Sequence, residues 1–142
     1  MKLRKTVVVD RPLQAVFDYL ADFTTTTEWD PGTVSTVREQ GDGGVGTAYR
    51  NTSEFLGRTT ELRYVVQELV PAQRIRLRGE NKTVAATDTM TFRQVDDGTE
   101  VTYAAEFALK GPARFLTPLL RPALERLGRQ AETGLRQALL RL

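Results

Sequence analysis

Apolar and polar residues alternate along most of the chain, and this period of two predicts a protein built mainly from β-strands. In the clearest segment, Ile75 and Leu77 share one side and arginines occupy the other, so the predicted sheet has one apolar and one solvated face. Turns rich in glycine or aspartate separate the segments, as in antiparallel hairpins. The predicted strands are Lys5 to Val9, Thr33 to Gln40, Thr47 to Phe55, Thr59 to Val70, Arg74 to Glu80, Thr83 to Val95 and Thr99 to Leu109.

The segment after the first strand follows helical spacing instead. Apolar residues recur at positions 13, 16, 17 and 20 after Pro12, with Asp10 as the predicted N-cap. A second short helix, weakened by four consecutive threonines, is expected to end at the sequence Trp29-Asp30-Pro31. The sequence therefore predicts two short helices between the first and second strands.

The C-terminal segment predicts one long amphipathic helix. Pro118 and Pro122 each remove a backbone donor, so we expect a kinked entry and a regular helix from about Leu119. Six arginines and two glutamates fall between positions 114 and 141, which makes a membrane-surface or phosphate-binding role conceivable. We favour a solvated outer face, because we expect the sheet to cover the apolar stripe. That stripe consists of Leu116, Leu120, Ala123, Leu127, Ala131, Gly134 and Ala138.

Composition narrows the classes of function. The 142 residues suit one domain, spanning residues 1–142, and contain neither cysteine nor histidine. This removes disulfides, thiolate nucleophiles, the commonest general base and the usual transition-metal ligands, so we predict no metal and no cofactor. No apolar run approaches the roughly 20 residues that cross a bilayer, and the basic start is interrupted too early for a signal peptide, so we predict a cytoplasmic protein without membrane insertion.

The basic residues are 16 arginines and 4 lysines, yet the formal net charge is only +2. No aromatic-and-basic motif accompanies them, so nucleic acid is not an expected partner. The sequence makes no prediction of oligomeric state.

Several short motifs resemble one known superfamily. They are Val9-Asp10-Arg11-Pro12, the run Val16 to Phe23, Trp29-Asp30-Pro31, Val45-Gly46-Thr47, the stretch Val66 to Pro71, Thr91-Phe92, and Asp97 to Tyr103. With this order of elements the chain resembles the START-like (SRPBCC) helix-grip superfamily, in particular its polyketide cyclase/dehydrase and lipid-transport branch. The resemblance implies an α+β fold in which a curved six- or seven-stranded antiparallel sheet wraps around the C-terminal helix. It also implies a hydrophobic cavity between them, and a family that includes aromatase/cyclases and lipid or hormone carriers.

Asp88 is the strongest polar candidate for a functional role. Alternation from Phe92 through Met90 places Asp88 on the inward face, where a carboxylate is costly unless it is paired. It could orient a polar ligand group or act as an acid or base with a raised pKa. The alternative, which we favour, is that Asp88 lies solvated at the rim of the sheet.

Other candidates have simpler structural interpretations. The hydroxyls of Tyr49, Tyr64 and Tyr103 could orient a ligand, although core tyrosines are at least as common, and Asn51 shares a face with Tyr49. Trp29 could lie at a pocket mouth, but we favour a packing role. The turn from Gly41 to Gly46 resembles a phosphate cradle only superficially, because it joins two strands.

Our leading hypothesis is a protein that binds a hydrophobic or amphipathic small molecule, such as a lipid, a polyketide or an aromatic compound, under the C-terminal helix. Burial would supply affinity, and Tyr49, Asn51 and Asp88 would orient the ligand. The second hypothesis is a polyketide aromatase/cyclase-like enzyme, with Asp88 as a weak catalytic candidate. The third is a protein-interaction module without a ligand. The predicted apolar lining is Leu62, Tyr64, Leu77, Met90, Phe92, Leu116, Leu120 and Leu127.

Overall fold

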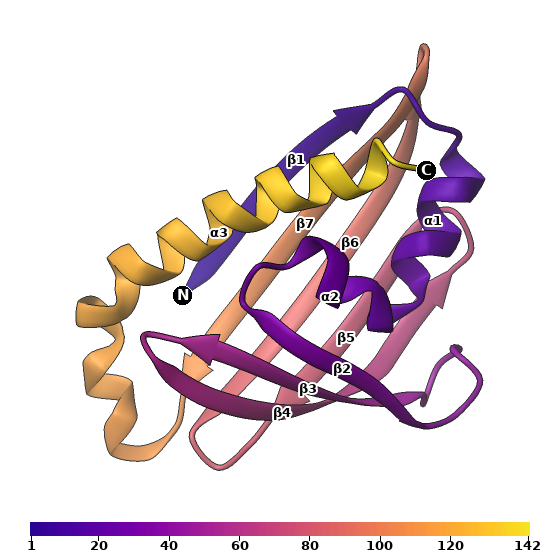
Figure 1. Cartoon of the computed structure of the whole chain (residues 1–142). Helices are drawn as coiled ribbons and strands as arrows, with labels where there is room; N and C mark the ends of the chain where they lie inside the picture. Colours follow the sequence, from indigo (N-terminus) through magenta and orange to yellow (C-terminus); the bar gives the residue numbers. More distant parts are fainter.

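The structure, a computed structural model, describes all 142 residues. Its main feature is one antiparallel sheet of seven strands in the order β1-β7-β6-β5-β4-β3-β2 (Figure 1). Strands β2 to β7 follow one another as hairpins, and β1 lies at one edge of the sheet, where it pairs with β7. The strands are β1 (Lys2–Val9), β2 (Thr33–Gln40), β3 (Ala48–Phe55), β4 (Arg58–Val70), β5 (Arg74–Glu80), β6 (Val84–Val95) and β7 (Gly98–Leu109). The fold class and the strand pattern predicted from the sequence are confirmed.

Local sequence explains why these strands form. In β5, Ile75 and Leu77 are buried while Arg78 is exposed, as strict alternation requires. The turn between β2 and β3 is a hairpin loop rather than a phosphate cradle, and Gly41 has a φ of 94° there. A side chain at Gly41 would also collide with Thr47. Both the backbone angle and the lack of space therefore require glycine at this position.

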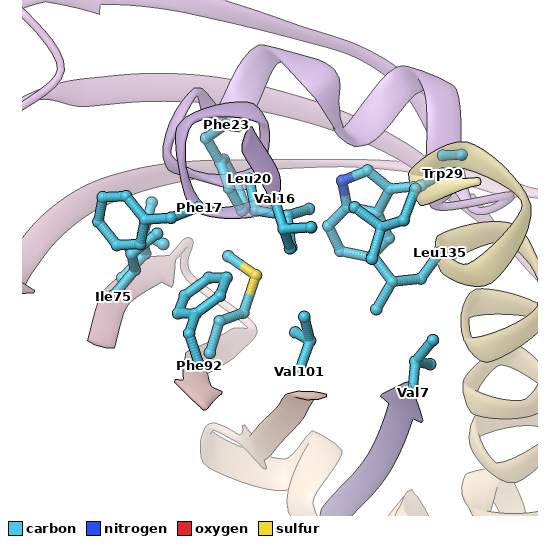
Figure 2. Packing of buried hydrophobic residues seen from close by; sticks show 14 of the residues in the cluster. Val7, Val16, Phe17, Leu20, Phe23, Trp29, Ile75, Phe92, Val101 and Leu135 are labelled. Atoms are coloured by element: carbon cyan, nitrogen blue, oxygen red, sulfur yellow. The ribbon is translucent and has the colours of Figure 1, made fainter. Parts of the chain in front are cut away.

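Two helices and a 3₁₀ turn cross the inner face of the sheet, which is the face that the helices cover: α1 (Leu13–Ala21), η1 (Phe23–Thr25) and α2 (Thr26–Trp29). Figure 2 shows Val16, Phe17 and Leu20 directed toward Phe92 and Val101 of the sheet. Phe17 meets Phe92 edge-on with ring centroids 5.1 Å apart. The predicted N-cap is wrong: Pro12 occupies that position without a side-chain bond, and Asp10 pairs with Arg11 instead.

The C-terminal segment is a 3₁₀ helix, η2 (Gly111–Leu116), followed by the long helix α3 (Thr117–Leu139). Regular helix begins at Thr117, two residues before the predicted start, because Pro118 falls in the first turn where no donor is needed. None of the structure's helices is long and apolar enough to cross a membrane.

Only the second half of the predicted apolar stripe is buried. The buried residues of α3 are Gly128, Ala131, Leu135, Ala138 and Leu139, and none precedes Gly128. Leu116 is exposed, and Leu120 and Leu127 are half-buried. The expectation that the sheet covers the whole stripe is therefore wrong, because the first turns of α3 extend away from the sheet (Figure 1).

Candidate ligand-binding site

Asp88 lies in the middle of the inner face. It is the fifth residue of β6 and has Leu77 of β5 and Ala105 of β7 as its register partners. Strands flank Asp88 on both sides, and it is only 4% exposed. The favoured interpretation of a solvated residue at the rim is wrong, since β6 continues four residues beyond Asp88 to Val84.

The two oxygens of the Asp88 carboxyl differ in their environment. Tyr103 donates its hydroxyl hydrogen to Oδ2 over 3.1 Å, whereas Oδ1 is buried without a hydrogen-bond partner. Burial raises the pKa of Asp88 to about 7; the hydrogen bond from Tyr103 lowers this pKa, and the nearby charge of Asp30 raises it. Asp88 can therefore change its protonation state near neutral pH.

Aromatic side chains surround this carboxyl. A side chain added at Gly79 would come within 2.7 Å of the Tyr64 ring, which shows that this ring lies directly over Gly79. Burial and the charge of Asp88 both raise the pKa of Tyr64, as they do for Tyr103. Trp29 meets Tyr103 edge-on with ring centroids 5.5 Å apart. The structure thus brings Tyr64, Tyr103 and Asp88 together, with Trp29 as a buried neighbour.

Tyr49 belongs to the same buried cluster, but it lies on β3, one strand farther from Asp88 than Tyr64. Its ring packs against Phe23 with centroids 5.6 Å apart, and burial raises its pKa. Tyr49 and Tyr64 are register partners on adjacent strands, but no hydrogen bond joins Tyr49 to Asp88.

Asn51 is held in a hydrogen-bond network between β3 and the α2–β2 segment. Its side-chain amide donates to the hydroxyls of Thr33 and Thr36, at 3.3 and 2.9 Å, and its carbonyl oxygen accepts from Ser53 at 2.6 Å. Thr33 in turn donates to Asp30 Oδ2 over 3.0 Å. The polar groups of Asn51 are therefore already occupied by the protein.

Asp30 was expected from the sequence only as part of a helix stop, yet its carboxyl lies near Asp88. Its Oδ1 accepts from the backbone N–H of Gly32 over 3.1 Å, and desolvation raises its pKa. A second carboxyl thus acts on Asp88, and no cation contributes to the environment of Asp88. In the sequence, an aspartate three residues before a threonine was a signal for this local turn. The sequence held no signal for the proximity of Asp30 to Asp88, which depends on the folded chain.

A surface groove of about 410 Å³ opens between the first half of α3 and the tip of the β3–β4 hairpin. Leu127 is the only residue of the predicted apolar lining that borders this groove. Leu62, Tyr64, Leu77, Met90 and Phe92 belong instead to the packed core. The groove is lined by Glu54, Phe55, Leu56, Pro122, Ala123, Arg126, Leu127 and Gln130.

A second hollow, of about 670 Å³, lies between α2 and α3. Only one of its 11 lining residues is hydrophobic, and Trp29, Asp30 and Gly134 are among them. Its polar lining makes it a poorer match for an apolar ligand than the groove beside Leu127.

Several solved structures share this fold. No curated protein sequence matches the chain. The fold is similar to that of the Zhui aromatase/cyclase from Streptomyces sp. R1128, with a TM-score of 0.83 and 16% identity over 99% of this chain and 94% of that one. It is also similar to the protein TTHA0849 from Thermus thermophilus, with a TM-score of 0.83 and 17% identity over 99% and 97% of the two chains.

A START superfamily protein from Mycobacterium smegmatis has a TM-score of 0.72 and 17% identity, over 96% of this chain and 98% of that one. At the level of sequence, residues 1–139 match the family described as polyketide cyclase/dehydrase and lipid transport. The chain therefore belongs to this polyketide cyclase/dehydrase and lipid-transport family.

Proposed function

We propose that the protein binds a hydrophobic or amphipathic small molecule between the sheet and the first half of α3. The observation that carries this proposal is the free Oδ1 of Asp88, a buried acceptor on the inner face without a partner in the protein. A buried polar group that lacks a partner is costly, so a ligand that donates a hydrogen bond there regains free energy.

The apolar part of the ligand occupies the groove beside Leu127. Phe55 lines this groove, and Val84 and Phe107 lie on β6 and β7, the strands that carry Asp88 and Tyr103; all three apolar side chains are only half-buried. These surfaces would be covered by a ligand, and their burial would contribute about 25 cal/mol for each Å² removed from water.

The polar end of the ligand is a hydroxyl rather than a carboxylate. Asp30 and Asp88 are both acidic, and no cation stands beside Asp88 to neutralise a third negative charge. A ligand carboxylate at this position would be repelled, whereas a hydroxyl hydrogen would be accepted by Oδ1.

Two matched probes test this proposal. Thermal shift and native mass spectrometry with 2-naphthol and 2-naphthoate compare a hydroxyl with a carboxylate on the same ring system. Trp29 is the only tryptophan and packs against Tyr103, so quenching of its emission reports occupancy near Asp88. We expect 2-naphthol to bind more tightly than 2-naphthoate, and Asp88→Asn to reduce that preference.

If neither probe binds, and no fatty acid or hydroxylated anthraquinone stabilises the protein, the ligand-binding proposal fails. That result would favour the protein-interaction hypothesis. If 2-naphthoate binds as tightly as 2-naphthol, the ligand-binding proposal stands but the role of Asp88 in selection does not.

The second candidate function is an aromatase/cyclase-like enzyme, and the pKa of Asp88 near 7 favours it. A carboxyl that titrates near the working pH can remove a proton from a carbon between two carbonyls and later return one to a leaving hydroxyl. Tyr103 holds the carboxyl in place through Oδ2. In a turnover assay with a synthetic poly-β-ketone mimic, Asp88→Asn should abolish activity but preserve binding; unchanged turnover would exclude this role.

A further inference from the structure

Four large apolar side chains form an exposed patch at one end of the molecule, which we call the apolar patch. It consists of Phe115, Leu116 and Leu119, from η2 and the start of α3, and Leu56 at the tip of the β3–β4 hairpin. Phe115 is 73% exposed, Leu119 is 77% exposed and Leu56 is 64% exposed. Such a concentration of apolar surface marks an interaction site when the chain does not cover it.

Nothing within the chain covers this patch. None of the six residues of η2 is buried, and α3 buries nothing before Gly128. Figure 1 shows η2 and the first turns of α3 standing clear of the sheet, near the β3–β4 tip. Leu56 and Pro122 border the same groove, so the apolar patch lies at the groove's mouth.

The charges beside the apolar patch are mainly positive. Between positions 110 and 126 the chain has Lys110, Arg114, Arg121 and Arg126 but only one acidic residue, Glu125. Lys110 is paired with Glu80 at 2.8 Å, whereas none of the three arginines forms an ion pair. The Arg114 guanidinium lies 5.0 Å from the centre of the Phe115 ring, so charge and apolar surface are interleaved.

We propose that the apolar patch and its three arginines dock on the surface of a membrane that contains anionic lipid. Phe115, Leu116, Leu119 and Leu56 enter the boundary between headgroups and acyl chains, while the arginines bind lipid phosphates through paired donors. Unpaired arginines around an apolar centre fit an anionic membrane surface better than a second copy of the chain. A second copy would bring the same unpaired arginines face to face.

This surface function goes beyond ligand binding and does not depend on it. Docking in this orientation would point the groove's mouth at the bilayer. A hydrophobic ligand could then move between lipid and groove without crossing water.

Vesicle co-sedimentation tests the proposal. We expect the protein to bind vesicles of phosphatidylcholine that contain about 30 mol% phosphatidylglycerol, to bind pure phosphatidylcholine weakly, and to be released by about 0.5 M salt. Phe115→Ser with Leu119→Ser should weaken binding by about tenfold or more, because two exposed apolar anchors are lost. Arg114→Gln with Arg121→Gln should reduce the preference for the anionic lipid.

Val8→Ser with Val34→Ser is the matched control, since both valines are 55% exposed but lie on β1 and β2. This control should bind vesicles like the original chain. Equal losses in the control and in the patch variant, or no binding by the original chain, would overturn the proposal. So would concentration-dependent dimerisation in gel filtration that Leu119→Ser abolishes, because the patch would then be covered by a second copy.

Discussion

Asp88 is the most strongly desolvated carboxyl on the inner face. Desolvation raises its pKa to about 7, and the hydrogen bond from Tyr103 offsets only part of this shift. An unfolded chain would titrate the same group near pH 4. Between about pH 4 and pH 7 the folded chain therefore holds a proton that the unfolded chain has lost, and stability falls as pH rises through this window.

The first prediction concerns this slope. Asp88→Asn removes the titration, so we expect the variant to lose less stability than the original chain between pH 5 and pH 8, by on the order of 2–4 kcal/mol. Urea denaturation at several pH values measures the difference. Asp97→Asn, at an exposed turn position, is the control and should leave the slope unchanged. Parallel slopes for the original chain and Asp88→Asn would contradict the assigned environment.

The second prediction concerns Gly79, which allows the Tyr64 ring to lie close to the sheet. A β-carbon at Gly79 would stand 2.7 Å from two ring carbons, so Gly79→Ala must displace Tyr64. We expect a loss of about 1–3 kcal/mol in the free energy of unfolding, and weaker binding of 2-naphthol. Gly44→Ala is the control, because only one carboxylate oxygen of Asp42, at 3.3 Å, comes within 4 Å of the added carbon. Equal stability of the two variants would argue against the tight contact.

At the scale of elements, α3 is held mainly by its second half, which contains all of its fully buried residues. There it lies against α2, and a β-carbon at Gly134 would collide with the backbone carbonyl oxygen of Trp29. The backbone cannot move aside as the end of a flexible side chain can, so this contact fixes the spacing of α2 and α3. Gly128, six residues earlier, faces only the flexible ends of two side chains, Leu3 at 3.2 Å and Lys5 at 3.6 Å.

These two glycines give the third prediction. Both Gly134→Ala and Gly128→Ala gain helix propensity, by about 1 kcal/mol. Only Gly134→Ala pushes α3 away from α2, and we expect it to lose about 2 kcal/mol or more relative to Gly128→Ala. Thermal unfolding of both variants, followed by circular dichroism, measures the difference. Similar melting temperatures would contradict the close approach of α2 and α3.

The helices and strands also show which structural features can be predicted from sequence patterns. Strand boundaries such as Thr33–Gln40 and Arg74–Glu80 were predicted correctly because alternation and turn residues act locally. The burial of Asp88 depends on strands that flank it on both sides, and the exposure of Leu116 depends on where the sheet ends. Neither property is encoded near the residue itself. Alternation did place Asp88 on the inner face, but it could not predict the hydrogen bond from Tyr103 or the approach of Asp30.

At the scale of the whole molecule, the inner face has a packed end and an open end. At the packed end, α1, α2 and the second half of α3 cover the sheet, and Figure 2 shows Leu135 beside Trp29 above Val7. At the open end, no residue of η2 or of the first half of α3 is fully buried, and the groove beside Leu127 is there. Asp88 lies between the two ends, so under the proposed function the apolar part of a ligand would lie on the open side of the carboxyl.

The fourth prediction follows from this division. Backbone amides of α3 before Gly128 have no buried side chains to hold them, and Pro122 removes one helical hydrogen bond, so they should exchange hydrogen at least about tenfold faster than those from Ala131 to Leu139. Saturating 2-naphthol should slow exchange in this first half of α3 and in the β3–β4 hairpin, and leave α1 unchanged. Mass spectrometry of peptic fragments resolves these segments. Protection confined to Thr27 to Pro31 would instead locate the probe in the polar hollow between α2 and α3, away from the groove.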